Sequence, residues 1–247
     1  VKTPWPATFA SRSAMPTSIE GPNQKDGRET PPLMRHQNCI ILVHGQTPGQ
    51  ILRDRILKEG TLSDGCTLRL SAFVNHQVDC VLMGQCGQVL AHRFKHSGLG
   101  IKKVVAPRSG VILAQAVAIN LQVPMVVAVT QAPTSSPEHT VHKTTRPSGG
   151  TYKGEQELFI SGEYIQPGDN VLVIDDVLAS GKMAVAIGQL VSMCGANVVG
   201  HGFLIEKSFL NGRAHLPSDA VVEPVVTIAS IDAGKIEFDR VSGMVIN

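Results

Sequence analysis

The sequence predicts an α/β fold in which helices cover both faces of a mostly parallel β-sheet. From about residue 101 onward, short apolar runs typical of buried strands alternate with longer helical patterns. One apolar run, VLVID at residues 171–175, continues into a second acid and a turn of small residues before the next helical pattern. Because open α/β sheets bind ligands beyond the carboxyl ends of their strands, this stretch also predicts where a site lies.

The individual elements follow from local signals. Thr47 and Gln50 fit a capping box, Pro48 suits a first helical position and Gly60 suits a stop, which together predict a first helix. A second helix is predicted from about residue 79 to 95, and residues 38–44 are a candidate short strand. The remaining predictions, in chain order, are a strand at 101–106, a helix at 110–121, strands at 124–129, 157–162 and 171–175, a helix at 181–196, and strands at 197–206 and 221–228.

Composition narrows the class of protein. The chain has 247 residues, 43% of them apolar, and a net charge of +2 without a concentrated basic face, which argues against a nucleic-acid binder. Five scattered cysteines with no CxxC pair favour reduced thiols and a cytoplasmic protein over a disulfide or zinc framework. No apolar run approaches the roughly 18 residues that a membrane span needs, so we expect no membrane partner.

Two segments differ from the rest of the chain. Residues 1–46 are rich in proline and lack periodicity, so we expect a poorly ordered extension before a main domain at 47–247. Residues 130–154 hold several prolines, glycines and hydroxyls without an apolar face, which predicts a long, structureless insert. Such inserts are often functional, and we interpret this one as a flexible active-site lid, with an ordinary surface loop as the alternative.

The stretch after the strand at 171–175 has the features of a phosphate-binding loop. A turn that leads into a helix directs free backbone N–H groups toward an anion, and the helix dipole adds to the attraction. Small residues allow close backbone approach, and the serine hydroxyl adds a donor. The predicted phosphate-binding residues are Leu178, Ala179, Ser180, Gly181 and Lys182, with Asp175 and Asp176 at the mouth of the loop.

The stretch VLVIDDVLASGKM resembles the phosphoribosyl-pyrophosphate signature of type I phosphoribosyltransferases. Further blocks, EGTLSDGCTLRLSAFVNHQVD, APRSG, LIEKSF and GKIEF, resemble the xanthine phosphoribosyltransferase family within that superfamily. The resemblance covers roughly residues 50–240. It implies a type I phosphoribosyltransferase fold, with a small hood formed by N- and C-terminal segments.

The resemblance implies an activity and its co-substrate. Members of this family transfer the 5-phosphoribosyl group from phosphoribosyl pyrophosphate to a purine base, here N9 of xanthine, and release pyrophosphate. Asp175 and Asp176 are expected to hold the ribose hydroxyls, and Arg108, Ser109 and Gly110 to contact pyrophosphate. Mg²⁺ is expected to bind through substrate oxygens without direct protein ligands. A homodimer is a further expectation from the family.

The same resemblance implies three base-binding residues, Leu68, Asn75 and Lys207. A lysine only donates hydrogen bonds, so Lys207 favours an oxo group over the amino group of adenine. Leu68 corresponds to an apolar position against the base, and Asn75 to a contact with the base edge. Without the resemblance, Asn75 would be interpreted as a turn or helix-cap residue, and Lys207 as a solvent-exposed lysine at a strand end.

The chain also departs from the family pattern. The strand at 124–129 lacks the basic stretch that usually follows it, and the next Lys or Arg is Lys143; Arg108 is a candidate replacement for the missing charge. Two other functions therefore stay open. One is a sister enzyme that acts on adenine, hypoxanthine or guanine. The other is a non-catalytic regulator that senses phosphoribosyl pyrophosphate, although residues 1–49 lack the helical pair and basic face of a DNA-binding domain.

Overall fold

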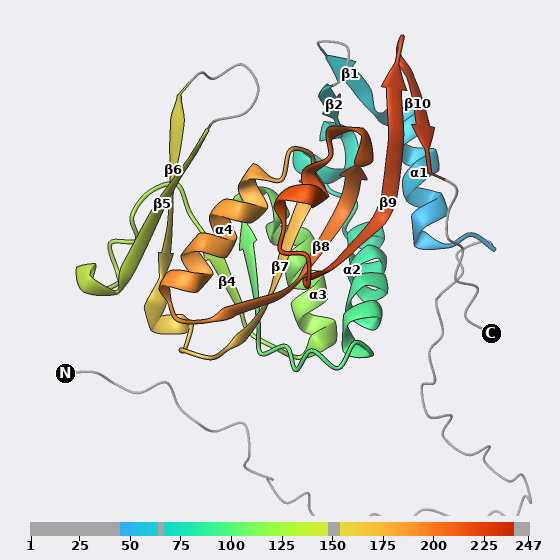
Figure 1. Cartoon of the computed structure of the whole chain (residues 1–247). Helices are drawn as coiled ribbons and strands as arrows, with labels where there is room; N and C mark the ends of the chain where they lie inside the picture. Colours follow the sequence, from blue (N-terminus) through green and yellow to red (C-terminus); the bar gives the residue numbers. More distant parts are fainter. Residues whose placement is uncertain (1–44, 64–66, 148–153, 240–247) are drawn as a thin grey trace, which may run out of the picture. The chain divides into compact units, whose positions relative to one another are not determined.

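The computed structural model describes residues 45–63, 67–147 and 154–239, and it has the predicted α/β architecture (Figure 1). The central sheet has the strand order β10–β9–β8–β7–β3–β4, in which β10 is antiparallel to β9 and all other neighbours are parallel. Most of the predicted extension at 1–46, and the candidate strand at 38–44, lie outside the described residues.

The strands are β1 (Thr61–Ser63), β2 (Thr67–Arg69), β3 (Lys103–Pro107), β4 (Met125–Ala128), β5 (Val141–Pro147), β6 (Glu155–Ser161), β7 (Asn170–Leu178), β8 (Asn197–Lys207), β9 (Val221–Asp232) and β10 (Lys235–Phe238). The helices are α1 (Pro48–Glu59), α2 (Cys80–Lys95), α3 (Val111–Leu121) and α4 (Lys182–Met193). Each predicted helix and strand between residues 47 and 228 is therefore present, with ends that shift by a few residues.

The first two helices begin close to where the sequence predicts, and a side chain caps each of them. At α1 the Gln50 backbone N–H donates to the Thr47 hydroxyl over 3.3 Å, and the Gln50 side chain accepts from the Thr47 N–H over 2.8 Å. This is the predicted capping box, with Pro48 at the first helical position. The Asp79 carboxylate caps α2 by accepting from the Leu82 N–H over 3.0 Å. Both caps satisfy backbone donors that have no partner within the helix.

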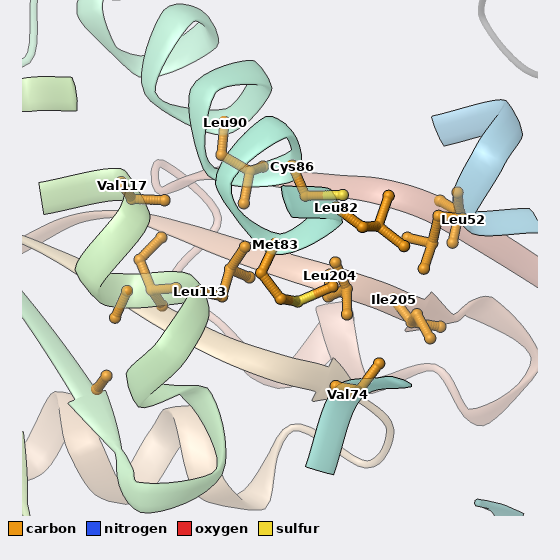
Figure 2. Packing of buried hydrophobic residues seen from close by; sticks show 14 of the residues in the cluster. Leu52, Val74, Leu82, Met83, Cys86, Leu90, Leu113, Val117, Leu204 and Ile205 are labelled. Atoms are coloured by element: carbon orange, nitrogen blue, oxygen red, sulfur yellow. The ribbon is translucent and has the colours of Figure 1, made fainter. Parts of the chain in front are cut away.

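Alternation along the strands divides the core between the two faces of the sheet. Leu172 and Ile174 of β7 belong to the cluster formed with α1, α2 and α3, whereas Val171 and Val173 pack with α4. Figure 2 shows the first cluster, where Leu52 of α1 and Leu90 of α2 point toward the same core as Leu204 of β8. Helices thus bury both faces, as a mostly parallel sheet requires.

The expected hood is formed by segments from the two ends of the described chain. The guanidinium of Arg53 in α1 lies 4.6 Å from the ring centroid of Phe238 in β10, and Gly49 lies against Val225 of β9. The short antiparallel pair β1–β2 lies next to this region in sequence, and Leu68 of β2 packs on the first cluster. None of the described helices is long and apolar enough to cross a membrane.

The predicted insert at 130–154 is not structureless, so that part of the prediction is wrong. Val141–Pro147 form β5, which pairs in antiparallel fashion with β6 into a two-stranded arm (Figure 1). The Thr144 hydroxyl donates to the Gln189 side chain of α4 over 2.7 Å, and Lys143 pairs with Glu157 over 2.9 Å. Residues 148–153, which belong to the predicted lid, lie outside the described residues.

Candidate active site

The predicted phosphate-binding loop lies between the end of β7 and the start of α4. Leu178 is buried at the strand end, while Ser180 and Lys182 are exposed at the turn and at the first residue of the helix. Gly181 is the N-cap and has φ +77°, a conformation that glycine adopts without strain. The first N–H groups of α4 have no acceptor within the helix, so this end of α4 suits an anion.

The predicted pyrophosphate residues lie beside this loop. They form η2 (Arg108–Gly110), a single 3₁₀ turn that follows β3, the neighbour of β7 in the sheet. The Ser109 hydroxyl donates to Asp175 Oδ1 over 2.7 Å, which ties the turn to β7. At Gly110 an added Cβ would lie 2.6 Å from the Asp175 Cα, so this close approach requires glycine. The structure therefore brings the predicted phosphate, pyrophosphate and ribose residues together.

The two acids of the pair have different surroundings. Asp175 is only 4% exposed, and its Oδ1 also accepts the Asp176 backbone N–H over 2.8 Å. Burial, and then the neighbouring charge of Asp176, raise the pKa of Asp175 well above its ordinary value, although the bond from Ser109 opposes this. Asp176 is half-buried, whereas Asp175 is almost fully buried. Asp176 is thus the more accessible of the two to a bound substrate.

The three predicted base-binding residues come from segments that share one hydrophobic cluster. Leu68 is half-buried in β2, and Asn75 is exposed at the end of η1 (Ser71–Asn75), a short π-helical turn. Val74, which precedes Asn75, points into the cluster that contains Leu204 and Ile205 of β8 (Figure 2). Residues of η1 and of the last part of β8 therefore contribute to one cluster, and the base-binding roles remain predictions.

The structure bears on the alternative interpretations of two base-site residues. Lys207 is the last residue of β8 and is 8% exposed, so it is not a solvated lysine at a strand end. Burying an ammonium group is costly unless it has polar partners, which is typical of a functional position. Asn75 does not cap α2, whose cap is Asp79, but it does end the turn η1, so its interpretation as a turn residue stays open.

The mouth of the loop offers carboxylate oxygens, which are the donors that a hard cation prefers. Among the residues that the structure describes, no three His, Cys, Asp or Glu side chains gather into a metal-binding group. Asp175 and Asp176 offer carboxylate oxygens, and Asp175 Oδ1 is already occupied by Ser109 and a backbone N–H. This arrangement suits Mg²⁺, which keeps several waters and binds through one or two carboxylates plus phosphate oxygens.

Sequence reasoning missed three residues next to the site. Glu206, at the end of β8, is 5% exposed and accepts two hydrogen bonds from Arg213. Arg213 lies in η6 (Gly212–His215), and Gly212 of that turn contacts the phosphate-binding loop. The dipeptide Asn211–Gly212 does signal a turn, but nothing local in the sequence indicates what the turn contacts.

The geometry just described, a phosphate-binding loop and an acidic pair at the ends of parallel strands, is that of a type I phosphoribosyltransferase. Solved structures agree on the fold. Adenine phosphoribosyltransferase from Rhodothermus marinus is 25% identical with a TM-score of 0.55, covering 72% of this chain and 99% of that one. The Saccharomyces cerevisiae enzyme, complexed with adenine and an imino-altritol bisphosphate, is 24% identical with a TM-score of 0.57, covering 72% and 98%.

Curated relatives resolve the family further. Xanthine phosphoribosyltransferase from Pseudomonas aeruginosa strain LESB58 is 37% identical over 190 residues, which cover 76% of this chain and 98% of that protein. The protein of the same name from Moorella thermoacetica is 34% identical over 190 residues, covering 76% and 95%. No family model matches the chain. The chain belongs to the xanthine phosphoribosyltransferase family, which confirms the resemblance found in the sequence.

Proposed function

We propose that the protein transfers the 5-phosphoribosyl group of phosphoribosyl pyrophosphate to N9 of xanthine, forming xanthosine 5-monophosphate and pyrophosphate. This is a purine-salvage reaction. The observation that carries the proposal is the Ser109–Asp175 hydrogen bond, which holds the pyrophosphate turn η2 beside the phosphate-binding loop in a chain of this family. This contact supports a site in which the two turns hold opposite ends of one ribose, at its 5-phosphate and at its pyrophosphate.

The reaction breaks the bond between ribose C1 and the pyrophosphate oxygen while N9 of the base bonds to C1. Positive charge develops on the ribose ring and negative charge on the departing pyrophosphate. The carboxylate of Asp176 accepts from a ribose hydroxyl and stabilises the charge on the sugar. The Arg108 guanidinium and the N–H groups of η2 stabilise the leaving group. Bound Mg²⁺ would supply further positive charge for the departing pyrophosphate, and Asp175 and Asp176 are the carboxylates at the mouth of the loop that would lie near it.

Base selection is assigned to Lys207, Asn75 and Leu68. The Lys207 ammonium donates to an exocyclic oxygen of xanthine, and its charge favours a base that readily loses a proton. Leu68 offers apolar contact to the base, and Asn75 hydrogen-bonds to its edge. Adenine carries an amino group at the corresponding position, so a buried donor-only side chain disfavours it.

Residues 130–154, which include β5 of the two-stranded arm, are proposed to act as the lid. In Figure 1 the β5–β6 hairpin rises toward the same side as the carboxyl ends of the parallel strands, where the phosphate-binding loop lies. Closure of such a segment would exclude water, which otherwise captures the ribosyl cation. A homodimer is also proposed from the family resemblance, and light scattering after gel filtration tests it. The cytoplasmic location stays a prediction from the cysteine pattern.

The test is nucleotide formation with each base in turn. Protein, Mg²⁺ and phosphoribosyl pyrophosphate are mixed with xanthine, guanine, hypoxanthine or adenine, and nucleotide and pyrophosphate are quantified. We expect xanthine to be used best, and Lys207→Ala to reduce kcat/KM for xanthine by about 10²-fold, because an unpaired oxo group is left in a buried site.

A control variant and two contrary results distinguish the proposed function from the adenine enzyme and from the non-catalytic regulator. Lys95→Ala, at an exposed position of α2, is the control for loss of a lysine and should leave base preference unchanged. Turnover of adenine alone would contradict the role of Lys207. Tight binding of phosphoribosyl pyrophosphate without turnover of any purine would favour the regulator instead.

A further inference from the structure

Arg213 joins three parts of the fold through one guanidinium group. Its Nε donates to Glu206 Oε1 over 3.0 Å and its Nη2 to Glu206 Oε2 over 2.6 Å, a two-pronged contact with the end of β8. Its Nη1 donates to the Val222 carbonyl of β9 over 3.0 Å. The turn η6, which carries Arg213, is therefore fixed to two neighbouring strands. Charged hydrogen bonds of this paired geometry are among the stronger ones in proteins.

The turn that Arg213 fixes lies directly against the phosphate-binding loop. A Cβ added at Gly212 would lie 2.1 Å from the Ala179 carbonyl oxygen and 2.9 Å from the Gly181 backbone nitrogen. A Cβ added at Gly181 would in turn lie 2.5 Å from the Gly212 carbonyl oxygen. The two turns thus contact each other backbone to backbone, with glycine on both sides of the contact.

We propose that Arg213 is a positioning residue that shapes the phosphate-binding loop through Gly212. The loop contains a glycine at positive φ and is followed by the N-terminus of α4, so its own sequence leaves it conformationally free. The turn η6, packed against the loop through Gly212, removes that freedom and holds the backbone N–H groups of the loop where the 5-phosphate binds. Arg213 itself does not contact substrate. This inference rests on the proposed function, because it assigns residues 178–182 to the 5-phosphate.

The position of the Arg213–Glu206 contact also explains why its loss should affect phosphoribosyl pyrophosphate more than the base. Glu206 precedes Lys207 on β8, but alternation places the two side chains on opposite sides of the strand. Loss of the Arg213 contact therefore releases η6 and the phosphate-binding loop without removing the proposed base contact. A misplacement of about 1 Å in a substrate-positioning group can cost up to about 10²-fold in rate.

The chain offers a matched control for this test in Arg93 of α2. Its Nη1 pairs with Glu223 over 3.3 Å and donates to the Pro224 carbonyl over 2.6 Å, so it also joins a glutamate and a β9 carbonyl. Arg93 follows Leu90 on the helix of the opposite sheet face, away from α4. Arg93→Met thus removes the same kind of contact without touching the phosphate-binding loop.

The experiment measures KM for each substrate in Arg213→Met, Arg93→Met and the unaltered protein, together with thermal unfolding. We expect Arg213→Met to raise KM for phosphoribosyl pyrophosphate about tenfold and KM for xanthine less than about twofold. Arg93→Met should leave both KM values unchanged. Arg213→Lys should have an intermediate effect on phosphoribosyl pyrophosphate, since lysine keeps the charge but not the paired geometry.

A second variant keeps the inference testable if Arg213→Met does not fold, because that change leaves the Glu206 carboxylate buried and unpaired. The double variant Glu206→Leu/Arg213→Met removes both charges, and replacement of a whole ion pair is often neutral for stability. It should show the same selective rise in KM. Folded variants whose KM for phosphoribosyl pyrophosphate matches that of Arg93→Met would overturn the inference. Failure of the unaltered protein to use xanthine would contradict the proposed function instead.

Discussion

Asp175 and Asp176 are adjacent in the sequence, yet their side chains have different roles in the structure. Asp175 is nearly fully buried and ties β7 to η2 through Ser109. Its position resembles that of a structural link more than that of a solvated acid. Asp176 is the accessible member of the pair. We therefore expect neutral substitutions at the two positions to have different effects on stability and on activity.

Asp175→Asn should stabilise the protein at neutral pH. Burial raises the pKa of Asp175 above its unfolded value, so folding favours the protonated carboxyl. The associated stability is present below the unfolded pKa, near 3.9 on average, and is lost as pH rises through the folded pKa. An amide cannot ionise and avoids this loss. We expect a higher melting temperature at pH 7.5, by about 2–4 °C for each kcal/mol gained in the free energy of unfolding.

The measurement for Asp175→Asn is thermal unfolding at pH 7.5 and at pH 4.5, compared with Asp176→Asn. The advantage of Asp175→Asn should shrink at the lower pH. Asp176→Asn should lose activity with a smaller gain in stability, because it removes the neighbouring charge but leaves Asp175 buried. A variant at Asp175 that is less stable than the unaltered protein at pH 7.5 would contradict the assigned cause of the pKa shift.

At the scale of elements, Arg55 connects α1, η1 and α2. Its Nη1 pairs with the α2 cap Asp79 over 2.7 Å, and its guanidinium lies 4.7 Å from the ring centroid of Phe73 in η1. The same side chain also pairs with Glu59 in α1. Because Asn75 ends η1, this junction sets the position of one proposed base contact.

Arg55→Met should therefore affect the base more than the phosphoribosyl donor. We expect a loss of about 2 kcal/mol in the free energy of unfolding, because the charged hydrogen bond to the cap of α2 disappears. KM for xanthine should rise several-fold while KM for phosphoribosyl pyrophosphate changes little, which is the reverse of Arg213→Met. Urea unfolding and steady-state kinetics measure the two effects. Equal changes in both KM values would show that the junction does not act through η1.

The elements themselves were largely predictable because their signals are local. The capping box at Thr47 and the alternation of apolar runs placed helices and strands within a few residues. β5 was missed because its sequence, VHKTTRP, has no apolar alternation. β5 is held by its pairing with β6 and by the hydrogen bond from Thr144 to Gln189 of α4. The residues of a strand do not by themselves reveal such contacts.

The candidate site was predictable only in its separate parts. Small residues and paired acids identified the loop and its neighbours, and the resemblance identified the base residues. The bond between Ser109 and Asp175 joins positions 66 apart, and it becomes visible only when β3 and β7 pair. Arg213 and Glu206 were missed for the same reason, since their partners are set by how β8, β9 and η6 fold together.

For the whole molecule, acid stability should depend on His201. This residue of β8 is 1% exposed, both ring nitrogens are buried without a hydrogen-bond partner, and burial lowers its pKa to about 4. A histidine held neutral in the fold contributes stability above its unfolded pKa, near 6.5, that is lost as pH falls toward 4. The loss should reach about 3 kcal/mol across this window. Asp175 has the opposite dependence, so the two effects partly offset each other below pH 6.5.

His201→Leu should make the free energy of unfolding depend less on pH. Urea unfolding at pH 7.5 and pH 4.5 gives the free energy of unfolding, and the difference between the two values should be smaller in the variant by about 2–3 kcal/mol. His139→Gln, at an exposed position, is the control and should keep the slope of the unaltered protein. If the difference between the two pH values is unchanged in His201→Leu, groups other than His201 cause the loss of stability in acid.

The central claim, that this molecule makes xanthosine 5-monophosphate, is tested most directly by competition. Xanthine, guanine, hypoxanthine and adenine are supplied together at equal concentrations with limiting phosphoribosyl pyrophosphate and Mg²⁺, and the nucleotides are separated and quantified. Product ratios then report ratios of kcat/KM without separate rate measurements. We predict that xanthosine 5-monophosphate dominates the products. A mixture dominated by adenosine or inosine 5-monophosphate would contradict the assignment.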